Sequence, residues 1–292
     1  MLEVGFGDGR FTVQSAALQP ELNIVGLEVS TASLMHAKKR IDNAGTTSIR
    51  LAKANAFFAI RHLFAPESLS VIIVNFPDPW PKEKHTKNRL LQDRFFQMAA
   101  TRLVPGGEIR LATDHPEYLA FAESEARGTG IFSVDAPEPP QRVFETKYAL
   151  KWRDQGKPLY YRVFTKTGTP NQDYPPLQRS ETMPHSILAG ATPTIPAFDK
   201  LVFDSADGHV IVHEAALAQT EHTRVLFRVS VDEPDLHQQL LIVLQERSSG
   251  EYIVRLEPFG DPVITKAVRG AIGALTDWLA EHTEITATAR HY

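Results

Sequence analysis

A run of prolines, an aspartate, aromatic residues and cations has the clearest chemical meaning in this sequence. It reads Asn-Phe-Pro-Asp-Pro-Trp-Pro from Asn75 to Pro81, and its three prolines restrict the backbone. The cations that follow are Lys82, Lys84, His85, Lys87, Arg89 and Arg94. Cations beside an aromatic ring and a carboxylate suit an RNA site, where phosphates are neutralised and an unstacked base is held by its edge. A proline-stiffened turn with a packed tryptophan is the structural alternative, and the combination favours the RNA site.

A glycine loop near the start of the chain is the second such feature. It has the pattern Glu3-x-Gly5-x-Gly7-x-Gly9 after a short apolar run. Missing side chains let backbone amides approach a ligand at the N-terminus of a following helix. A dinucleotide-binding pattern would need glycine where Arg10 stands, which disfavours NAD.

Polar residues also end the second and third predicted strands. Glu28 ends the second, where a carboxylate can accept hydrogen bonds from both hydroxyls of a ribose, and the spacing suits S-adenosylmethionine. Asn55 follows the third and could contact an adenine edge, although asparagine in such a turn is commonly structural. With the glycine loop, they predict a nucleoside-like ligand along the carboxyl edge of the sheet.

The elements that must position these residues form a parallel sheet flanked by helices, because apolar runs alternate with helical patterns. The five expected strands, rich in Ile, Val and Leu, are the stub before Gly5 and residues 23–29, 48–54, 69–75 and 108–113. Ser30 is expected to cap a helix that ends at Gly45, and a second helix is expected over residues 89–103. Residues 131–134 and 159–165 could add edge strands.

A proline-rich stretch over residues 169–197 predicts a linker. We therefore expect an α/β domain with a class I, Rossmann-like sheet over residues 1–168 and a smaller α+β domain over residues 198–292. Alternating strands and a helix over residues 262–279 predict an antiparallel meander backed by that helix. Dimerisation and partner binding are equal hypotheses for this domain, and the oligomeric state stays open.

Composition limits the classes of protein. The 292 residues are 42% hydrophobic and 23% charged, as in a soluble globular protein. There is no cysteine, no signal-peptide pattern and no apolar run of about 20 residues, so we expect a cytoplasmic protein that does not span a membrane. From Asp199 onward, 8 Lys and Arg stand against 15 Asp and Glu, whereas the residues before it have 23 against 20. An anionic partner is therefore expected at the front half.

Taken together, these motifs resemble the bacterial tRNA (guanine-N7)-methyltransferase family over roughly residues 1–165. The matching segments are LEVGFGDGRF, NIVGLEVS, NFPDPWPKEKHTKNRLL, GGEIRLATD and ETKYALKW, in the family's order and spacing. The resemblance implies a class I S-adenosylmethionine-dependent fold and methyl transfer to N7 of a guanine in tRNA. The implied target is the variable-loop guanine at position 46, and no metal is expected.

The resemblance also implies roles for single residues. With the loop glycines, the expected cofactor-binding residues are Glu3, Gly5, Gly7, Glu28, Asn55 and Asp78. The expected substrate-binding residues are Lys82, Asp114 and Thr146, to which the basic segment adds His85 and Arg89 as phosphate contacts. Asp78 is the implied catalytic residue. Because N7 has a free lone pair, positioning should dominate, and a carboxylate can hold guanine N–H donors and stabilise the cation that develops.

Three departures from the family pattern leave alternatives open. Asn88 stands where members usually carry Arg, and Ala149 replaces the carboxylate of their Thr-x-Tyr/Phe-Glu motif. The first strand is also short, so the natural start is expected upstream of Met1. The alternative functions are a tRNA-binding or regulatory homologue with impaired catalysis and a methyltransferase for a small molecule.

Overall fold

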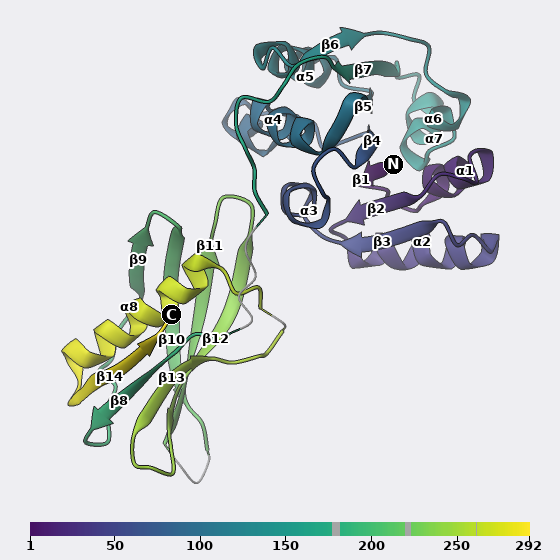
Figure 1. Cartoon of the computed structure of the whole chain (residues 1–292). Coiled ribbons are helices and arrows are strands. Elements are labelled where there is room, and N and C mark those ends of the chain that lie inside the picture. The colour runs from purple at the N-terminus through teal and green to yellow at the C-terminus, as the bar shows by residue number, and fades with distance from the viewer. Residues whose placement is uncertain (177–181, 220–222, 261) are drawn as a thin grey trace. The chain divides into compact units, whose positions relative to one another are not determined.

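The computed structural model describes residues 1–176, 182–219, 223–260 and 262–292. The chain forms two compact units, Met1–Pro176 and Leu177–Tyr292, which are described separately (Figure 1). The first unit is a sheet between two layers of helices, and the second is a sheet with one long helix.

The sheet of the first unit has seven strands in the order β3-β2-β1-β4-β5-β7-β6. Its strands are β1 (Leu2–Val4), β2 (Ile24–Glu28), β3 (Ile49–Lys53), β4 (Leu69–Asn75), β5 (Leu103–Thr113), β6 (Phe132–Asp135) and β7 (Tyr160–Lys166). Neighbours are parallel except at β7, which is antiparallel to β5 and β6. The expected Rossmann-like α/β class is confirmed. The strand order reverses between β1 and β4, and a ligand crevice forms at the carboxyl ends of strands at such a point.

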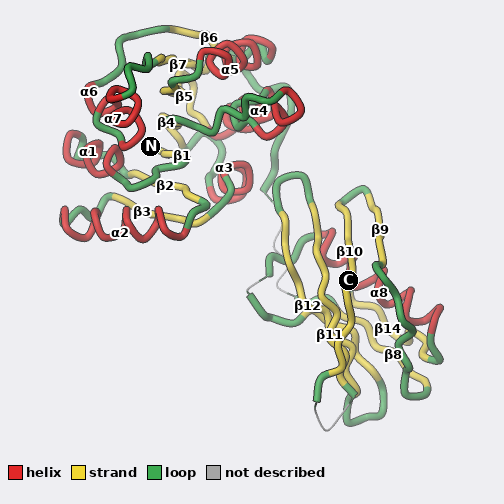
Figure 2. Tube along the Cα trace, turned by 180° about the vertical axis from the view of Figure 1, so that it is seen from behind, coloured by secondary structure: helices red, strands yellow, loops and turns green. Residues whose placement is uncertain are grey.

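Helices cover both faces of this sheet (Figure 2). They are α1 (Arg10–Leu18), α2 (Thr31–Ala44), α3 (Ala56–Leu63), α4 (Asp93–Arg102), α5 (Pro116–Gly128), α6 (Gln141–Phe144), α7 (Lys147–Asp154) and the 3-10 helix η1 (Glu83–Asn88). One layer holds α3, α4 and α5, and the other holds α1, α2, α6 and α7. Within the described ranges, no helix is long and apolar enough to cross a membrane.

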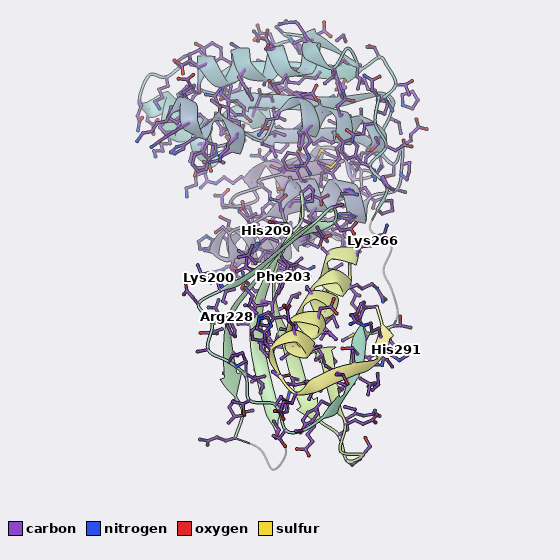
Figure 3. The ribbon with its side chains drawn as sticks, turned by 90° about the vertical axis from the view of Figure 1, so that its left-hand side faces the viewer. Lys200, Phe203, His209, Arg228, Lys266 and His291 are labelled. Carbon is purple, nitrogen blue, oxygen red and sulfur yellow. The ribbon has the colours of Figure 1, made fainter. Side chains whose placement is uncertain are left out.

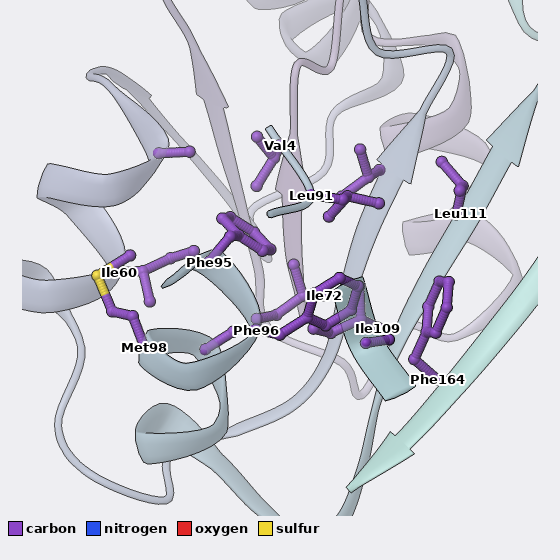
Figure 4. Packing of buried hydrophobic residues seen from close by; sticks show 14 of the residues in the cluster. Val4, Ile60, Ile72, Leu91, Phe95, Phe96, Met98, Ile109, Leu111 and Phe164 are labelled. Carbon is purple, nitrogen blue, oxygen red and sulfur yellow. The ribbon is translucent and has the colours of Figure 1, made fainter. Parts of the chain in front are cut away.

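The larger hydrophobic cluster of the first unit lies between the sheet and the layer of α3, α4 and α5 (Figure 4), and a smaller one lies under α1, α2 and α6. Phe96 of α4 is fully buried, and its ring centroid lies 5.1 Å from that of Phe164 on β7 and 5.4 Å from that of Phe132 on β6. Ile72 and Leu111 of the central strands are also fully buried. This packing fixes β4 and β5, and hence the loop that follows β4.

The helix boundaries agree with the expectations at α2 and differ at α4. Ser30 caps α2 by accepting a 3.3 Å bond from the Ser33 amide, and Gly45 ends it in the left-handed conformation. The helix expected from Arg89 begins at Asp93 instead. Arg89 has an extended backbone (ψ 139°), because η1 ends there and its side chain turns into the protein.

The second unit is a seven-stranded antiparallel sheet in the order β14-β8-β13-β12-β11-β10-β9. Its elements are β8 (His185–Gly190), β9 (Leu201–Ser205), β10 (Gly208–Leu217), β11 (Arg224–Asp232), β12 (His237–Glu246), β13 (Tyr252–Leu256), α8 (Lys266–His282) and β14 (Ile285–His291). Helix α8 lies across one face, and its Val268, Ile272 and Leu275 are fully buried against the sheet (Figure 3). The expected meander, from β9 to β13, and the helix behind it are both present.

Two strands of this sheet, β8 and β14, were not predicted from the sequence. Strand β8 lies inside residues 169–197, which the prolines had marked as linker, and pairs with both β13 and β14. The second sheet therefore begins before residue 198. Residues 177–181 of the expected linker lie outside the described residues.

Candidate functional site

A cavity of about 590 Å³ opens at the carboxyl ends of the parallel strands. Residues from the glycine loop, from the ends of β2 and β3 and from the run after β4 line it, including Gly5, Gly7, Glu28, Asn55, Asn75, Phe76, Asp78, Trp80 and Tyr148. A smaller recess of about 90 Å³ shares part of this wall and adds Glu3 and Thr146. All the residues expected to bind the cofactor therefore line the cavity or the recess that adjoins it.

A larger cavity, of about 670 Å³, lies at the opposite ends of the strands, by the start of β5 and the end of β7. Its two buried cations are already bonded. Arg102 donates to the backbone oxygens of Ile60 and Tyr174, and Lys166 donates to that of Leu103 at 2.8 Å. Because both cations already have hydrogen-bond partners, neither is free to bind a ligand. We therefore do not take this cavity as the functional site, although it is larger than the one at the carboxyl ends of the strands.

The glycine loop forms one wall of the cavity without side chains. Gly5 and Gly7 have positive φ values of 74° and 56°, and a Cβ on either would project into space with no other protein atom within 4 Å. Gly9 serves packing instead, because a Cβ there would lie 2.8 Å from the Cβ of Ala37 on α2. A flat ligand can thus lie against the backbone at Gly5 and Gly7, as the expected S-adenosylmethionine requires.

Glu28 bridges the cavity at the end of β2. One carboxylate oxygen accepts bonds from the amides of Val29 (2.8 Å) and Ser30 (3.0 Å), and the other accepts one from the Gly7 amide at 3.1 Å. A carboxylate has about four acceptor sites, so one remains for a ribose hydroxyl. Binding both hydroxyls requires the long bond from Gly7 to be given up.

Asn55 combines a structural role with a place in the cavity. Its side-chain oxygen accepts a 2.8 Å bond from the Phe57 amide and so caps α3. Its side-chain amino group stays available to a ligand, because this capping bond uses only the oxygen. The residue therefore fits the expected adenine contact through its N–H donors.

Glu3 and Asn75 place buried polar groups beside the recess. Glu3 is 1% exposed and accepts a 2.6 Å bond from the Thr12 hydroxyl. Burial raises the pKa of Glu3 to about 7, against the lowering effects of Thr12, Asn75 and Arg142. The Asn75 amide lies beside Glu3 and lowers its pKa, but neither of its buried polar atoms makes a hydrogen bond of normal geometry among the described residues. Such groups are uncommon, so this amide fits a ligand that donates and accepts hydrogen bonds, as the amino-acid part of the expected cofactor does.

The run after β4 is held in an unusual backbone shape. Phe76 and Trp80 have φ values of 52° and 40°, in the left-handed region that bulky residues rarely occupy. The Phe76 amide is fixed by a 2.7 Å bond to the carbonyl of Ala112 on β5. Asp78 is exposed and lines the cavity between these two strained positions. Strain of this kind persists where surrounding structure over-determines the backbone.

Arg89 supplies part of that surrounding structure, and its burial in this structure does not favour the expected contact with phosphate. Its side chain is 6% exposed and lies 4.8 Å from the ring centroid of Phe121. The guanidinium donates to the carbonyls of Pro79 (3.0 Å) and Trp80 (3.4 Å). A cation held on two backbone oxygens and an aromatic ring is not offered to an RNA backbone, so Arg89 braces the run instead.

The other cations of the segment remain at the surface. Lys82, Lys84 and Lys87 are exposed on or beside η1. His85 is half-buried, with its ring edge-to-face with Trp80 at 5.8 Å. None of these four lines either cavity, so they are not placed to contact a cofactor there.

Asp114 and Thr146 are both engaged by other groups. Asp114 forms a 3.1 Å ion pair with Lys157 and lines neither cavity. The Thr146 hydroxyl donates to Val143 at 3.0 Å and accepts from the Ala149 amide at 3.2 Å, which caps α7. Thr146 lines the recess and keeps one acceptor lone pair for a substrate.

Four residues with no role predicted from the sequence line both cavities: Ser33, Asn75, Phe76 and Tyr148. The position of Asn75 at the end of β4 is a usable signal, since Glu28 and Asn55 occupy the corresponding positions after β2 and β3. Tyr148 comes from α7, and no local pattern indicates that this helix approaches the glycine loop.

The sequence of the chain is similar to those of several known proteins. A family described as putative methyltransferase matches residues 1–161. Proteins named tRNA (guanine-N(7)-)-methyltransferase from Thermus thermophilus and Deinococcus radiodurans are each 40% identical, over 97% and 96% of this chain and 89% and 88% of their own lengths. A protein of the same name from Halorhodospira halophila is 37% identical but matches 56% of this chain and 74% of its own length.

Proposed function

The chain belongs to the tRNA (guanine-N7)-methyltransferase family and uses S-adenosylmethionine, and on this premise we propose that it methylates the variable-loop guanine at position 46 of tRNA. The proposal depends on two features that meet at one cavity. The backbone at Gly5 and Gly7 forms a wall against which the cofactor can lie, and the strained run after β4 contributes Asp78 and is followed by exposed cations. A loop position suits this site, because a base in a loop can leave its stack to enter a cavity.

In the proposed reaction, the residues of this chain position the reactants. Bound S-adenosylmethionine supplies an electrophilic methyl carbon, to which guanine N7 gives its lone pair as the carbon–sulfur bond breaks and its electrons pass to sulfur. Glu28 and Asn55 orient the ribose and adenine from their strand ends, and the Asn75 amide holds the amino-acid end. Asp78 accepts guanine N–H donors and stabilises the positive charge that the ring gains. No strong base is needed, since N7 carries no proton.

The RNA contacts that we propose come from the rim of the cavity. Lys82, Lys84 and Lys87 are exposed and make no ion pair in the described part of the chain, so their charge is available to phosphates. His85, held edge-to-face on Trp80, lies beside them. Asp114 can join the substrate only when its bond from Lys157 opens.

The test of the target position uses tRNA transcripts that differ in one atom or one base. Wild-type tRNA, a variant with adenine in place of the position-46 guanine, and one with 7-deazaguanine there are incubated with enzyme and S-adenosylmethionine, then digested for nucleoside mass spectrometry. We expect 7-methylguanosine from the first alone. If the adenine variant still yields 7-methylguanosine, the position is wrong while the N7 chemistry stands.

A second candidate, a tRNA-binding homologue with impaired catalysis, is motivated by two positions. Ala149 is 5% exposed and offers no carboxylate, and Asn88 stands at the rim of the cavity without a positive charge. This candidate predicts that S-adenosylmethionine and tRNA both bind while no 7-methylguanosine forms. A small-molecule methyltransferase would instead show substrate binding that is insensitive to salt, whereas RNA binding weakens steeply as salt rises.

For the second unit we propose dimerisation or binding of a protein partner rather than RNA binding. Its arginines are largely occupied by carboxylates, as in the pairs Arg224–Glu257 (3.1 Å) and Arg228–Glu214 (2.6 Å). Light scattering of the full chain across concentrations tests dimerisation, and a monomer at every concentration would leave partner binding.

A further inference from the structure

Three aromatic rings from two distant segments line up beside the candidate site. Tyr148 on α7 lies between Phe76, whose ring centroid is 6.4 Å away, and Trp152, whose ring is 6.3 Å away and tilted by 27°. Tyr148 and Trp152 are four residues apart, so they share one face of α7. Phe76 belongs to the strained run after β4.

The middle ring of this series is offered to the cavity. Tyr148 is 45% exposed, and it lines both the cofactor cavity and the smaller recess. Tyr118 shows what a packed tyrosine looks like in the same unit, because it is fully buried and its hydroxyl accepts a bond from the Leu91 amide. In the described part of the chain the Tyr148 hydroxyl makes no hydrogen bond, so no polar contact of the hydroxyl fixes this ring beside Phe76 and Trp152.

Lys157 and Asp114 fix the Trp152 end of this series of rings. Trp152 has the ammonium of Lys157 3.5 Å from its ring centroid, and Lys157 in turn pairs with Asp114 at 3.1 Å. These contacts tie the end of α7 to the residue that follows β5. Tyr148 is therefore held in position by an ordered series of contacts, as a binding surface requires.

We propose that Tyr148 is a positioning residue that stacks against the target guanine, an inference that rests on the proposed function. The target ring enters the reaction neutral. It leaves with a positive charge, because N7 donates its lone pair to the methyl carbon while the electrons of the carbon–sulfur bond go to sulfur. An aromatic face attracts a cation more strongly than a neutral ring. The contact with Tyr148 thus strengthens as the methyl group is transferred, which is the condition for an interaction to accelerate a reaction.

The experiment compares the affinities of one enzyme for two forms of tRNA. The dissociation constants for unmethylated tRNA and for product tRNA carrying 7-methylguanosine are measured by filter binding without S-adenosylmethionine. The variants are Tyr148→Leu, which keeps an apolar side chain without an aromatic face, and Tyr148→Phe, which keeps the face. Phe144→Leu is the matched control, since Phe144 is similarly exposed at 37% and lines neither cavity.

Tyr148→Leu should reduce the preference for methylated over unmethylated tRNA by about 5- to 30-fold, as loss of a cation–aromatic contact predicts. Tyr148→Phe and Phe144→Leu should keep the wild-type ratio. An unchanged ratio in Tyr148→Leu overturns the inference, and so does a loss of S-adenosylmethionine affinity with both tRNA affinities intact, which would make Tyr148 a cofactor wall. If the wild type yields no 7-methylguanosine in tRNA, the proposed function itself fails, and that result is distinct from an unchanged ratio.

Discussion

The two units handle their polar side chains in opposite ways. At and near the cavity of the first unit, the buried Asn75 amide makes no hydrogen bond of normal geometry, Asp78 makes no ion pair, and the lysines of η1 are exposed without carboxylates, as far as the described residues show. On the second sheet, the cations are paired with acids, as Arg228 is with Glu214 (Figure 3 labels Arg228). Polar groups left unsatisfied around a cavity mark a place where a ligand completes the structure, and paired groups mark a surface that is already complete. The predictions below test that difference.

The largest effect is expected at the exposed carboxylate of the cavity. Asp78→Ala should lower the rate of tRNA methylation by about 10²- to 10³-fold, the usual loss when a group that stabilises transition-state charge is removed. Single-turnover assays with saturating tRNA and S-adenosylmethionine measure this loss. A variant that turns over like the wild type would remove Asp78 from catalysis and weaken the contrast between the units.

Arg89 tests the comparison within the first unit. Its guanidinium is held by two carbonyls and an aromatic ring, whereas the neighbouring lysines make no ion pair among the described residues. Arg89→Lys cannot serve two carbonyls and an aromatic ring at once, so we expect a loss of about 2 kcal/mol in the free energy of unfolding and about 10-fold in turnover. The salt dependence of tRNA binding should stay the same. A slope of log Kd against log salt that falls by about 1 would show that Arg89 contacts a phosphate after all.

Glu3 tests whether burial in the first unit makes stability depend on pH. Its pKa in the folded chain is about 7, above the ordinary 4.5, so the folded state keeps a proton that the unfolded state has lost. The wild type should therefore lose stability as pH rises from about 4.5 to 7, by at most about 1.4 kcal/mol per pH unit, and then level off. Glu3→Gln removes this term. Urea unfolding of both proteins at several pH values measures the difference, and parallel curves would mean that Glu3 does not titrate in this range.

The smallest effects separate the surfaces of the two units. Lys87→Ala should weaken tRNA binding by a few-fold at low salt and lower the salt slope by about 1, because an exposed unpaired lysine can hold one phosphate. Arg228→Ala is the matched variant on the second sheet, where the loss of an exposed ion pair should change stability by less than about 1 kcal/mol and tRNA affinity not at all. Equal losses in tRNA affinity from both variants would give the second unit an RNA contact.

How much the sequence could predict depended on whether the deciding contact was local. The bounds of β4 and the cap of α2 follow from an apolar run and from Ser30 with Gly45, all close together in the chain, and these predictions were confirmed. The burial of Arg89 depends on Phe121 of a later helix. The basic segment around Arg89 therefore gave no sign that this cation is buried. Tyr148 reaches the site for the same long-range reason. The site residues that were predicted lie at strand ends, where topology alone brings side chains together.

Strand β8 lies between β14 and β13 in the second sheet but comes first of the strands of that unit in the chain, and this has a consequence for the order in which the protein is made. As the chain emerges from a ribosome, β8 appears first, and four further strands are synthesised before its neighbour β13, with β14 later still. Both hydrogen-bonding edges of β8 stay unpaired during that interval. Unpaired strand edges are templates for pairing with other chains. The nascent second unit is thus most exposed to aggregation, and most in need of a chaperone, while β9 to β12 are being synthesised.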